Sequence, residues 1–225
     1  MRLTFTLAAL MLAGCTQDAP MDAEAEPWNY EEHVVRRAAE IGASPVERGG
    51  VLFVGDSITE GGGDWSARIP GVVTSNHGVS GDTTGAVLAR MDQVARGTPE
   101  RVFLMIGTND FGESVSLETA EDAAEGALAV AEAIRRRLPD ADLYVQSVLP
   151  REPARADMVR TVNARLAASA DRLGYTYLDL HPPFATPDGA LRPELTEDDL
   201  HLTELGYALW AELIGPCVRE GCEGV

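Results

Sequence analysis

Lysine is absent from this chain of 225 residues: its 18 basic residues are all arginine, against 36 aspartate and glutamate residues. The resulting formal charge of −18 repels phosphate backbones, so nucleic acid is not expected as a partner. Salt screens the self-repulsion of so acidic a surface, so the composition suits a saline medium. The three cysteines and four histidines form no spacing typical of a zinc site. The sequence therefore predicts neither a metal nor a cofactor.

Long apolar runs are also missing after residue 14. The one apolar run, at residues 3–12, follows Met1 and Arg2, as in a signal peptide, and is too short to span a bilayer. The sequence Leu-Ala-Gly-Cys at residues 12–15 resembles the bacterial lipobox. That resemblance implies removal of residues 1–14, lipidation of Cys15 and export to the cell envelope, outer membrane or periplasm-facing. An ordinary secretory cleavage is the alternative.

The rest of the chain is expected to form one domain behind a tether. Residues 15–27 are small, acidic and punctuated by proline, a composition typical of a flexible tether. Membrane contact is therefore expected through the lipid anchor only. Residues 28–225 have the length and, with 45% hydrophobic residues overall, the composition of one packed domain.

Strand and helix patterns alternate along this domain. Strands are predicted near residues 51–54, 72–74, 102–106, 143–148 and 175–178, and helices near 28–41, 65–69, 83–95, 117–138, 156–173 and 203–214. Such alternation predicts an α/β fold, a three-layer α/β/α sandwich around a five-stranded parallel sheet.

The two ends of the domain carry further expectations. In the first helix, Val34, Val35, Ala38 and Ile41 are expected to face the core and His33 the solvent. At the far end, Cys217 and Cys222 lie five residues apart. In an exported protein such a pair predicts a small terminal disulfide loop.

Polar side chains follow the predicted strands where each one ends. Ser57 comes after the first strand in Gly-Asp-Ser, Gly81 lies in a glycine-rich turn after the second, and Asn109 follows the third. Asp198 and His201 lie three residues apart before the last helix. Taken singly, these are ordinary helix caps and turn residues. Because the carboxyl ends of parallel strands meet at one sheet edge, the set is expected to converge.

This set suits nucleophilic catalysis. A serine hydroxyl attacks only when a base such as His201 takes its proton. The base needs a carboxylate on its other ring nitrogen to fix the tautomer and stabilise the imidazolium. Asp199 competes for that role, but the three-residue spacing favours Asp198. The backbone N–H groups of Ser57 and Gly81, with the Asn109 amide, would then hold the oxyanion.

These motifs resemble the SGNH hydrolases, also called the GDSL esterases and lipases, across residues 50–214. Four blocks occur in order: Gly-Asp-Ser at residues 55–57, Gly-Val-Ser-Gly-Asp at 78–82, Gly-Thr-Asn-Asp at 107–110, and the Asp198–His201 pair. The resemblance implies a flavodoxin-like fold, an acyl-enzyme at Ser57 and no metal. His77 and His181 match no block and are interpreted as structural.

A closer resemblance is to the platelet-activating factor acetylhydrolase-like branch, in Leu-Pro-Arg at residues 149–151 and in residues 201–207. It implies a short, chiefly acetyl, ester on a small molecule or carbohydrate. One alternative is a lysophospholipase or thioesterase acting on longer acyl chains. The other, from a different class, is a surface lipoprotein that binds glycans without turnover. The oligomeric state is not predicted.

Overall fold

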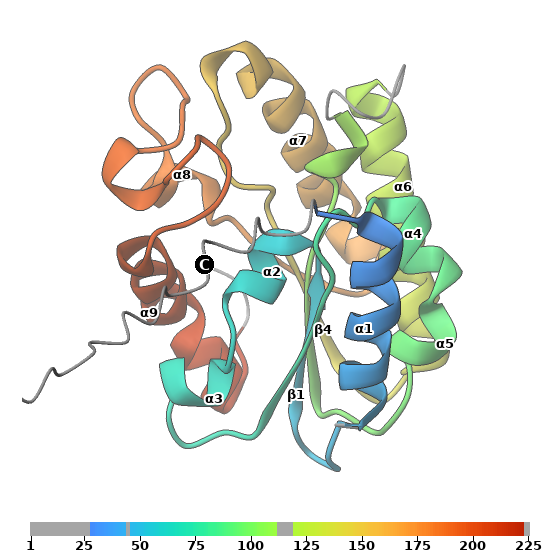
Figure 1. Ribbon diagram of the computed structural model, residues 1–225. Helices are drawn as coiled ribbons and strands as arrows, with labels where there is room; N and C mark the ends of the chain where they lie inside the picture. The colour runs from blue at the N-terminus through green and yellow to red at the C-terminus, as the bar shows by residue number, and fades with distance from the viewer. Residues whose placement is uncertain (1–27, 44–45, 112–118, 223–225) are drawn as a thin grey trace, which may run out of the picture.

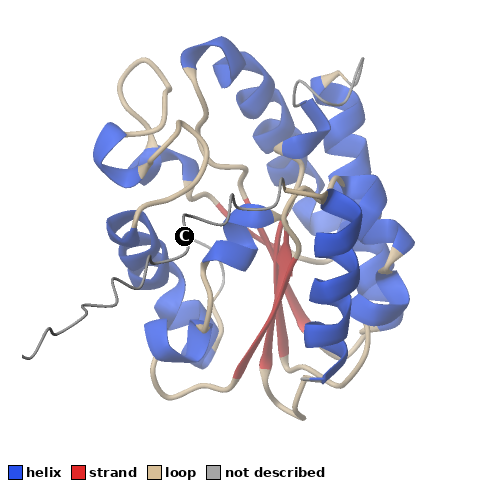
Figure 2. Ribbon diagram, viewed as in Figure 1, coloured by secondary structure: helices blue, strands red, loops and turns tan. Residues whose placement is uncertain are grey.

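A computed structural model describes residues 28–43, 46–111 and 119–222. The predicted signal peptide, Cys15 and the tether lie outside these residues. The strands are β1 (Val51–Gly55), β2 (Thr74–Gly78), β3 (Arg101–Met105), β4 (Asp142–Gln146) and β5 (Thr176–Leu178). They form one parallel sheet in the order β2-β1-β3-β4-β5, drawn in red in Figure 2. The predicted α/β fold with a five-stranded parallel sheet is confirmed.

Helices cover both faces of the sheet (Figure 1). On one side lie α1 (Tyr30–Ala43), α4 (Thr84–Ala89), α5 (Met91–Val94), α6 (Ala120–Arg137) and α7 (Ala156–Leu173). On the other lie α3 (Trp65–Arg68), α8 (His181–Phe184) and α9 (Glu204–Glu220), while α2 (Ser57–Gly61) sits at the carboxyl edge. Short 3₁₀ helices are η1 (Asn109–Phe111), η2 (Pro153–Arg155) and η3 (Pro193–Leu195). Within the described ranges, no helix is long and apolar enough to cross a membrane.

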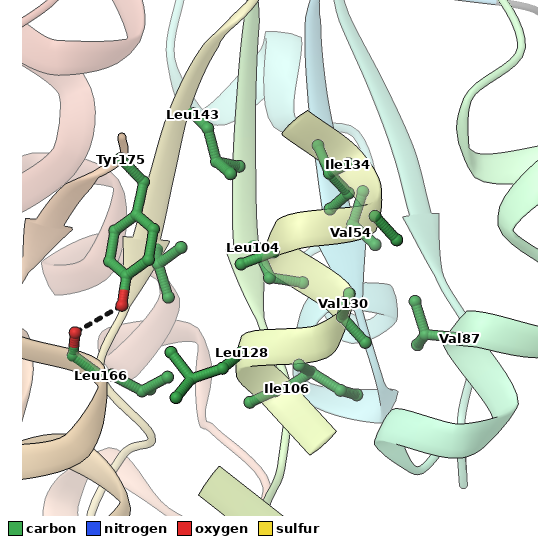
Figure 3. Packing of buried hydrophobic residues seen from close by; sticks show 14 of the residues in the cluster. Val54, Val87, Leu104, Ile106, Leu128, Val130, Ile134, Leu143, Leu166 and Tyr175 are labelled. Carbon is green, nitrogen blue, oxygen red and sulfur yellow. Dashed lines mark hydrogen bonds between the residues drawn. The ribbon is translucent and has the colours of Figure 1, made fainter. Parts of the chain in front are cut away.

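The two faces of the sheet have different cores. Successive strand residues point to opposite faces, so Leu52 and Val54 pack under the alanine-rich α6, in the cluster that Figure 3 shows. On the other face, Phe53 stacks on Trp65 with ring centroids 4.5 Å apart, and Trp65 meets Trp210 of α9 edge-on at 4.8 Å. Because both faces are covered, the strands can be continuously apolar, as β1 is.

Three elements differ most clearly from the sequence-based prediction. The second strand begins at Thr74 rather than Val72, because β2 is an edge strand whose first three residues are partly exposed and need no apolar side chains. The helix predicted at 83–95 is interrupted at Arg90, whose side chain turns back to the sheet. The last helix continues past Pro216 to Glu220, where burial of its last turns and the Cys217–Cys222 disulfide retain the helix.

The prediction for the first helix is wrong at two side chains. Val35 is 71% exposed rather than buried, and of the four expected core positions only Ile41 is fully buried. The His33 side chain is only 10% exposed, because its Nε2 lies 2.9 Å from a carboxylate oxygen of Glu60. The helix therefore uses polar contacts as well as apolar ones on its inner side.

Candidate active site

Two glycines allow the helix that carries Ser57 to pack closely against the sheet edge. Gly55 of β1 and Gly78 of β2 are paired in the ladder. A Cβ atom at Gly55 would lie 2.2 Å from Oγ1 of Thr59 on α2, and one at Gly78 would lie 2.2 Å from the backbone nitrogen of Glu60. Any side chain at either position would push α2 away from the strand ends. The turn after β1 therefore holds Ser57 firmly at the carboxyl edge.

Ser57 is the first residue of α2, and the side chain of Asp56 caps this helix by accepting from the backbone N–H of Ile58 at 3.0 Å. The Ser57 amide belongs to the first helical turn, whose N–H groups have no partner within the helix. The Asp56 carboxyl is fully buried. Burial, with a smaller contribution from the nearby Asp82, raises the pKa of Asp56 to about 7. Close to neutral pH this carboxyl is therefore partly protonated.

A continuous chain of hydrogen bonds joins Ser57, His201 and Asp198. The Nε2 atom of His201 lies 3.0 Å from the Oγ of Ser57, and its Nδ1 lies 2.7 Å from Oδ2 of Asp198. With Nδ1 donating to the carboxylate, Nε2 is left to accept from the serine hydroxyl. The structure therefore brings together three residues that the sequence places up to 144 positions apart.

The loop that holds Asp198 and His201 is a compact turn. The other carboxylate oxygen of Asp198 accepts from the backbone N–H groups of Leu200 at 3.1 Å and His201 at 2.7 Å. Asp199 takes the left-handed backbone conformation, with φ of 64°, and Asp198 alone of the two contacts the imidazole. Burial acts to raise the pKa of Asp198, but the hydrogen bonds from His201 outweigh it and the pKa is lowered.

The loop after β2 carries Gly81, which adopts φ of 86°, a conformation that favours glycine. The next residue, Asp82, offers its carbonyl oxygen to Nδ2 of Asn109 at 2.9 Å. Its carboxylate accepts from Nε of Arg90 at 2.6 Å and from the Tyr30 hydroxyl at 3.1 Å. These contacts place Asn109 beside the Gly81 loop, with the second Nδ2 hydrogen still available to a ligand.

Arg90 connects the same region to the sheet, and Asp110 connects it to α4. A terminal nitrogen of Arg90 donates to the carbonyl oxygens of His77, at 2.9 Å, and Gly55, at 3.4 Å. The buried Asp110 carboxylate accepts from the backbone N–H and the hydroxyl of Thr84 at the start of α4. The carboxyl ends of β1 and β2 are therefore both held by the side chain of Arg90.

Sequence reasoning missed three residues near the site. Glu60 contacts the glycine loop from α2, Tyr30 contacts Asp82, and the indole of Trp28, 66% exposed, lies against Gly81. No local pattern marks them, because Trp28 and Tyr30 approach from the start of the domain and Glu60 opens a stretch of three glycines with no predicted helix. Only the folded arrangement reveals their positions.

His77 and His181 lie away from this hydrogen-bonded chain. Both ring nitrogens of the buried His77 have no partner among the described residues, and burial lowers its pKa to about 4. Burial also lowers the pKa of His181. Within residues 28–43, 46–111 and 119–222, no group of three His, Cys, Asp or Glu side chains could hold a metal. The cysteines Cys217 and Cys222 form a disulfide at the end of α9.

A serine, a histidine and a carboxylate linked in this order at the edge of a parallel sheet define the arrangement of a serine hydrolase. Ser57 and Asn109 flank the boundary between β1 and β3, where the strand order reverses and such sheets bind ligands. Residues 53–209 match the GDSL-like Lipase/Acylhydrolase family. The chain belongs to this family, as the motifs predicted, and is an ester hydrolase.

Curated relatives support the closer resemblance as well. The chain is 31% identical over 167 residues to platelet-activating factor acetylhydrolase IB subunit alpha1 of Pongo abelii, covering 70% of each chain. It is 33% identical over 168 residues to subunit alpha2 of the same enzyme from Homo sapiens, covering 70% of this chain and 71% of that one.

Solved structures share the fold. A candidate platelet activating factor from Streptococcus pneumonia superposes with a TM-score of 0.72 at 24% identity, covering 84% of this chain and 92% of that one. A GDSL-like lipase from Bacteroides thetaiotaomicron VPI-5482 gives a TM-score of 0.63 at 24% identity, with coverage of 86% and 98%. At these identities the likeness establishes the SGNH fold and nothing finer.

Proposed function

We propose that this protein is an exported serine esterase that hydrolyses short-chain, chiefly acetyl, carboxylic esters through an acyl-enzyme at Ser57. The observation that carries the proposal is the continuous hydrogen-bonded chain from Ser57 through His201 to Asp198. A site that only bound an ester would have no need for a base aligned on the serine hydroxyl.

In the first step, the Oγ of Ser57 attacks the carbonyl carbon of the ester while Nε2 of His201 takes the hydroxyl proton. Asp198 stabilises the imidazolium through Nδ1. The negative charge that develops on the carbonyl oxygen is held by the N–H groups of Ser57 and Gly81 and by the Asn109 amide.

The tetrahedral intermediate then expels the alcohol, which leaves with the proton from His201, and an acyl-serine remains. A water molecule attacks the acyl-serine after His201 takes its proton. As the second intermediate collapses, the bond to Oγ of Ser57 breaks, His201 returns the proton to Oγ, and the carboxylic acid is released. Every proton transfer uses the same imidazole, and the charge of both intermediates falls on the same oxygen.

Two observations support a short acyl group, and a third supports a larger alcohol part. The curated relatives are acetylhydrolases, and the resemblance in residues 201–207 points the same way. The exposed indole of Trp28 beside Gly81 offers an aromatic face to the alcohol part of a carbohydrate or phospholipid ester. Longer acyl chains are the competing substrates.

The test is hydrolysis of a series of p-nitrophenyl esters, from acetate to octanoate, by the wild type and Ser57→Ala. We expect kcat/KM to be highest for acetate and to fall with chain length, and the variant to lose about 10⁴-fold or more of kcat. A maximum at octanoate would favour a lysophospholipase or thioesterase. Equal rates for wild type and variant would refute the esterase and favour a glycan-binding protein.

We further propose that Cys15 is lipidated and that residues 15–27 tether the domain to the cell envelope. Support comes from the Leu-Ala-Gly-Cys motif and the acidic, proline-punctuated segment after it. Cys15→Ala should move the enzyme from the membrane to the soluble fraction or block its processing, whereas Cys217→Ala should not. A Cys15→Ala protein that fractionates with membranes as the parent does would overturn the anchor.

A further inference from the structure

The Glu60 carboxylate connects α2, which carries Ser57, with the loop after β2, which carries Gly81. One of its oxygens accepts from the backbone N–H and from the hydroxyl of Ser80, each at 2.7 Å. The same oxygen lies 2.9 Å from Nε2 of His33. Glu60 stands three residues after Ser57 on α2, and Ser80 directly precedes Gly81. A single side chain thus connects the helix of the nucleophile with the loop of an oxyanion donor.

This carboxylate is partly buried and remains charged. Its side chain is 21% exposed. Burial acts to raise the pKa of Glu60, but the hydrogen bonds from Ser80 and His33 outweigh burial and the pKa is lowered. Arg37 lies 3.7 Å from its other oxygen. Charged acceptors form stronger hydrogen bonds than neutral ones, so the link to Ser80 is a strong one.

Helix α1 completes this arrangement from outside the family match at residues 53–209. It supplies His33, and its Arg37 also donates to the carbonyl oxygens of Gly78 at 2.9 Å and Asn76 at 2.7 Å. Tyr30 packs beside Gly81. Besides packing on α5, helix α1 therefore makes polar contacts with α2, with β2 and with the loop that follows β2.

We infer that Glu60 is a positioning residue that fixes the Ser80–Gly81 segment relative to Ser57, so that the Gly81 N–H points at the developing oxyanion. The inference rests on the proposed esterase mechanism. Gly81 stands in a backbone conformation that glycine adopts freely but does not enforce. Neighbouring contacts must therefore orient its amide, and the two bonds from Ser80 to Glu60 do so one residue away.

A positioning role predicts a particular kinetic signature. The oxyanion exists only in the transition state and the intermediates, so a misplaced Gly81 amide lowers kcat and leaves KM nearly unchanged. A displacement of about 1 Å in a catalytic site can cost about 10²-fold in rate. A merely structural residue would lower the amount of folded enzyme and the thermal midpoint, with kcat per folded molecule unaffected.

The experiment compares Glu60→Ala and Glu60→Gln with Glu40→Gln, using p-nitrophenyl acetate and correcting for folded enzyme. Glu40 is a matched control, because it pairs with the same Arg37 at 3.0 Å and is half exposed. We expect Glu60→Ala to lower kcat about 10–100-fold. Glu60→Gln should restore most of that loss, because its amide oxygen can still accept from Ser80. Glu40→Gln should match the wild type.

Hydrogen exchange of peptides covering residues 78–84 gives a readout that does not depend on turnover. Glu60→Ala should speed exchange there, and Glu40→Gln should not. Unchanged exchange in Glu60→Ala, or a normal kcat per folded molecule, would overturn the positioning role. If the wild type were inactive and Glu60→Ala still showed fast exchange, the proposed function would be overturned, but the contact between Glu60 and the loop would be supported. The two failures are therefore distinguishable.

Discussion

The candidate site has two halves that are built differently. The nucleophile half comprises α2, the loop at residues 79–83 and Asn109. Its parts are connected to one another and to neighbouring segments through the buried or partly buried carboxylates of Glu60, Asp82 and Asp110, which accept from Ser80, Arg90 and Thr84. The acid–base loop comprises residues 196–202. It is a surface turn in which the side chains of Asp198 and His201 are 52% and 43% exposed.

The difference follows from what each half must do. Donors to an oxyanion stabilise charge best when they are fixed in place and water is kept out. A base that exchanges protons with a leaving alcohol and then with water must be reached by both. The proposed oxyanion donors therefore lie beside the strand ends in the nucleophile half, and the proposed base lies on the accessible acid–base loop.

Among the residues that support Ser57 in the two halves, the largest effect is expected for Asn109→Ala, which removes a proposed oxyanion donor from the nucleophile half. We expect kcat to fall about 10²–10³-fold, equivalent to about 2.7–4 kcal/mol, with KM nearly unchanged. The amide also donates to the Asp82 carbonyl oxygen, so the thermal midpoint must be measured on the same preparation. A lowered midpoint with normal kcat would make Asn109 a turn residue only.

A smaller effect is expected for Asp198→Ala in the exposed half. A hydrogen bond to a charged group contributes about 1.5–3 kcal/mol, and water can replace part of it at a half-exposed carboxylate. We expect kcat to fall about 10–10²-fold, and the control Asp199→Asn, which tolerates the left-handed backbone, to behave as wild type. A loss of about 10⁴-fold would show that kcat depends on the exposed acid–base loop at least as strongly as on the nucleophile half.

The smallest effect is expected in stability, from Asp56→Asn. The folded-state pKa of Asp56, about 7, lies above the ordinary aspartate value of 3.8. Between these values the folded carboxyl keeps a proton that the unfolded chain releases, so raising the pH destabilises the wild type. Asparagine can still cap α2 but cannot titrate.

From about pH 5 to about pH 6, the wild type should therefore lose about 1 kcal/mol relative to Asp56→Asn. Urea unfolding of both proteins at each pH measures the difference. Parallel pH dependence in the two proteins would mean that the buried carboxyl does not titrate in this range, and that the nucleophile half carries no such pH sensitivity.

The sequence predicted the parts of this molecule that local patterns determine. The central strands β1 and β3 are buried on both faces and so are nearly continuous apolar runs, and Ser57 and Asn109 directly follow their ends. The end of α7 at Gly174 was also predictable, since that glycine adopts the left-handed cap conformation.

What the sequence could not predict depends on contacts between distant segments. The edge strand β2 is polar because one side faces solvent, and the break between α4 and α5 lies where Arg90 reaches Asp82 and the strand ends. The burial of His33 depends on Glu60, which follows it by 27 positions. The exposure of Asp198 depends on how its loop folds, and the three-residue spacing between Asp198 and His201 does not determine it.

The residues of the site lie far apart in the sequence and are therefore synthesised at different times. Ser57, Gly81 and Asn109 all lie in the first half of the chain, whereas His201 follows Ser57 by 144 positions. His201 lies just before α9, whose Trp210 packs against Trp65 of α3 on the same side of the sheet. A nascent or truncated chain without these last residues therefore carries a nucleophile without a base. Under the proposed mechanism, ester hydrolysis therefore requires a chain that extends past residue 201 and has folded.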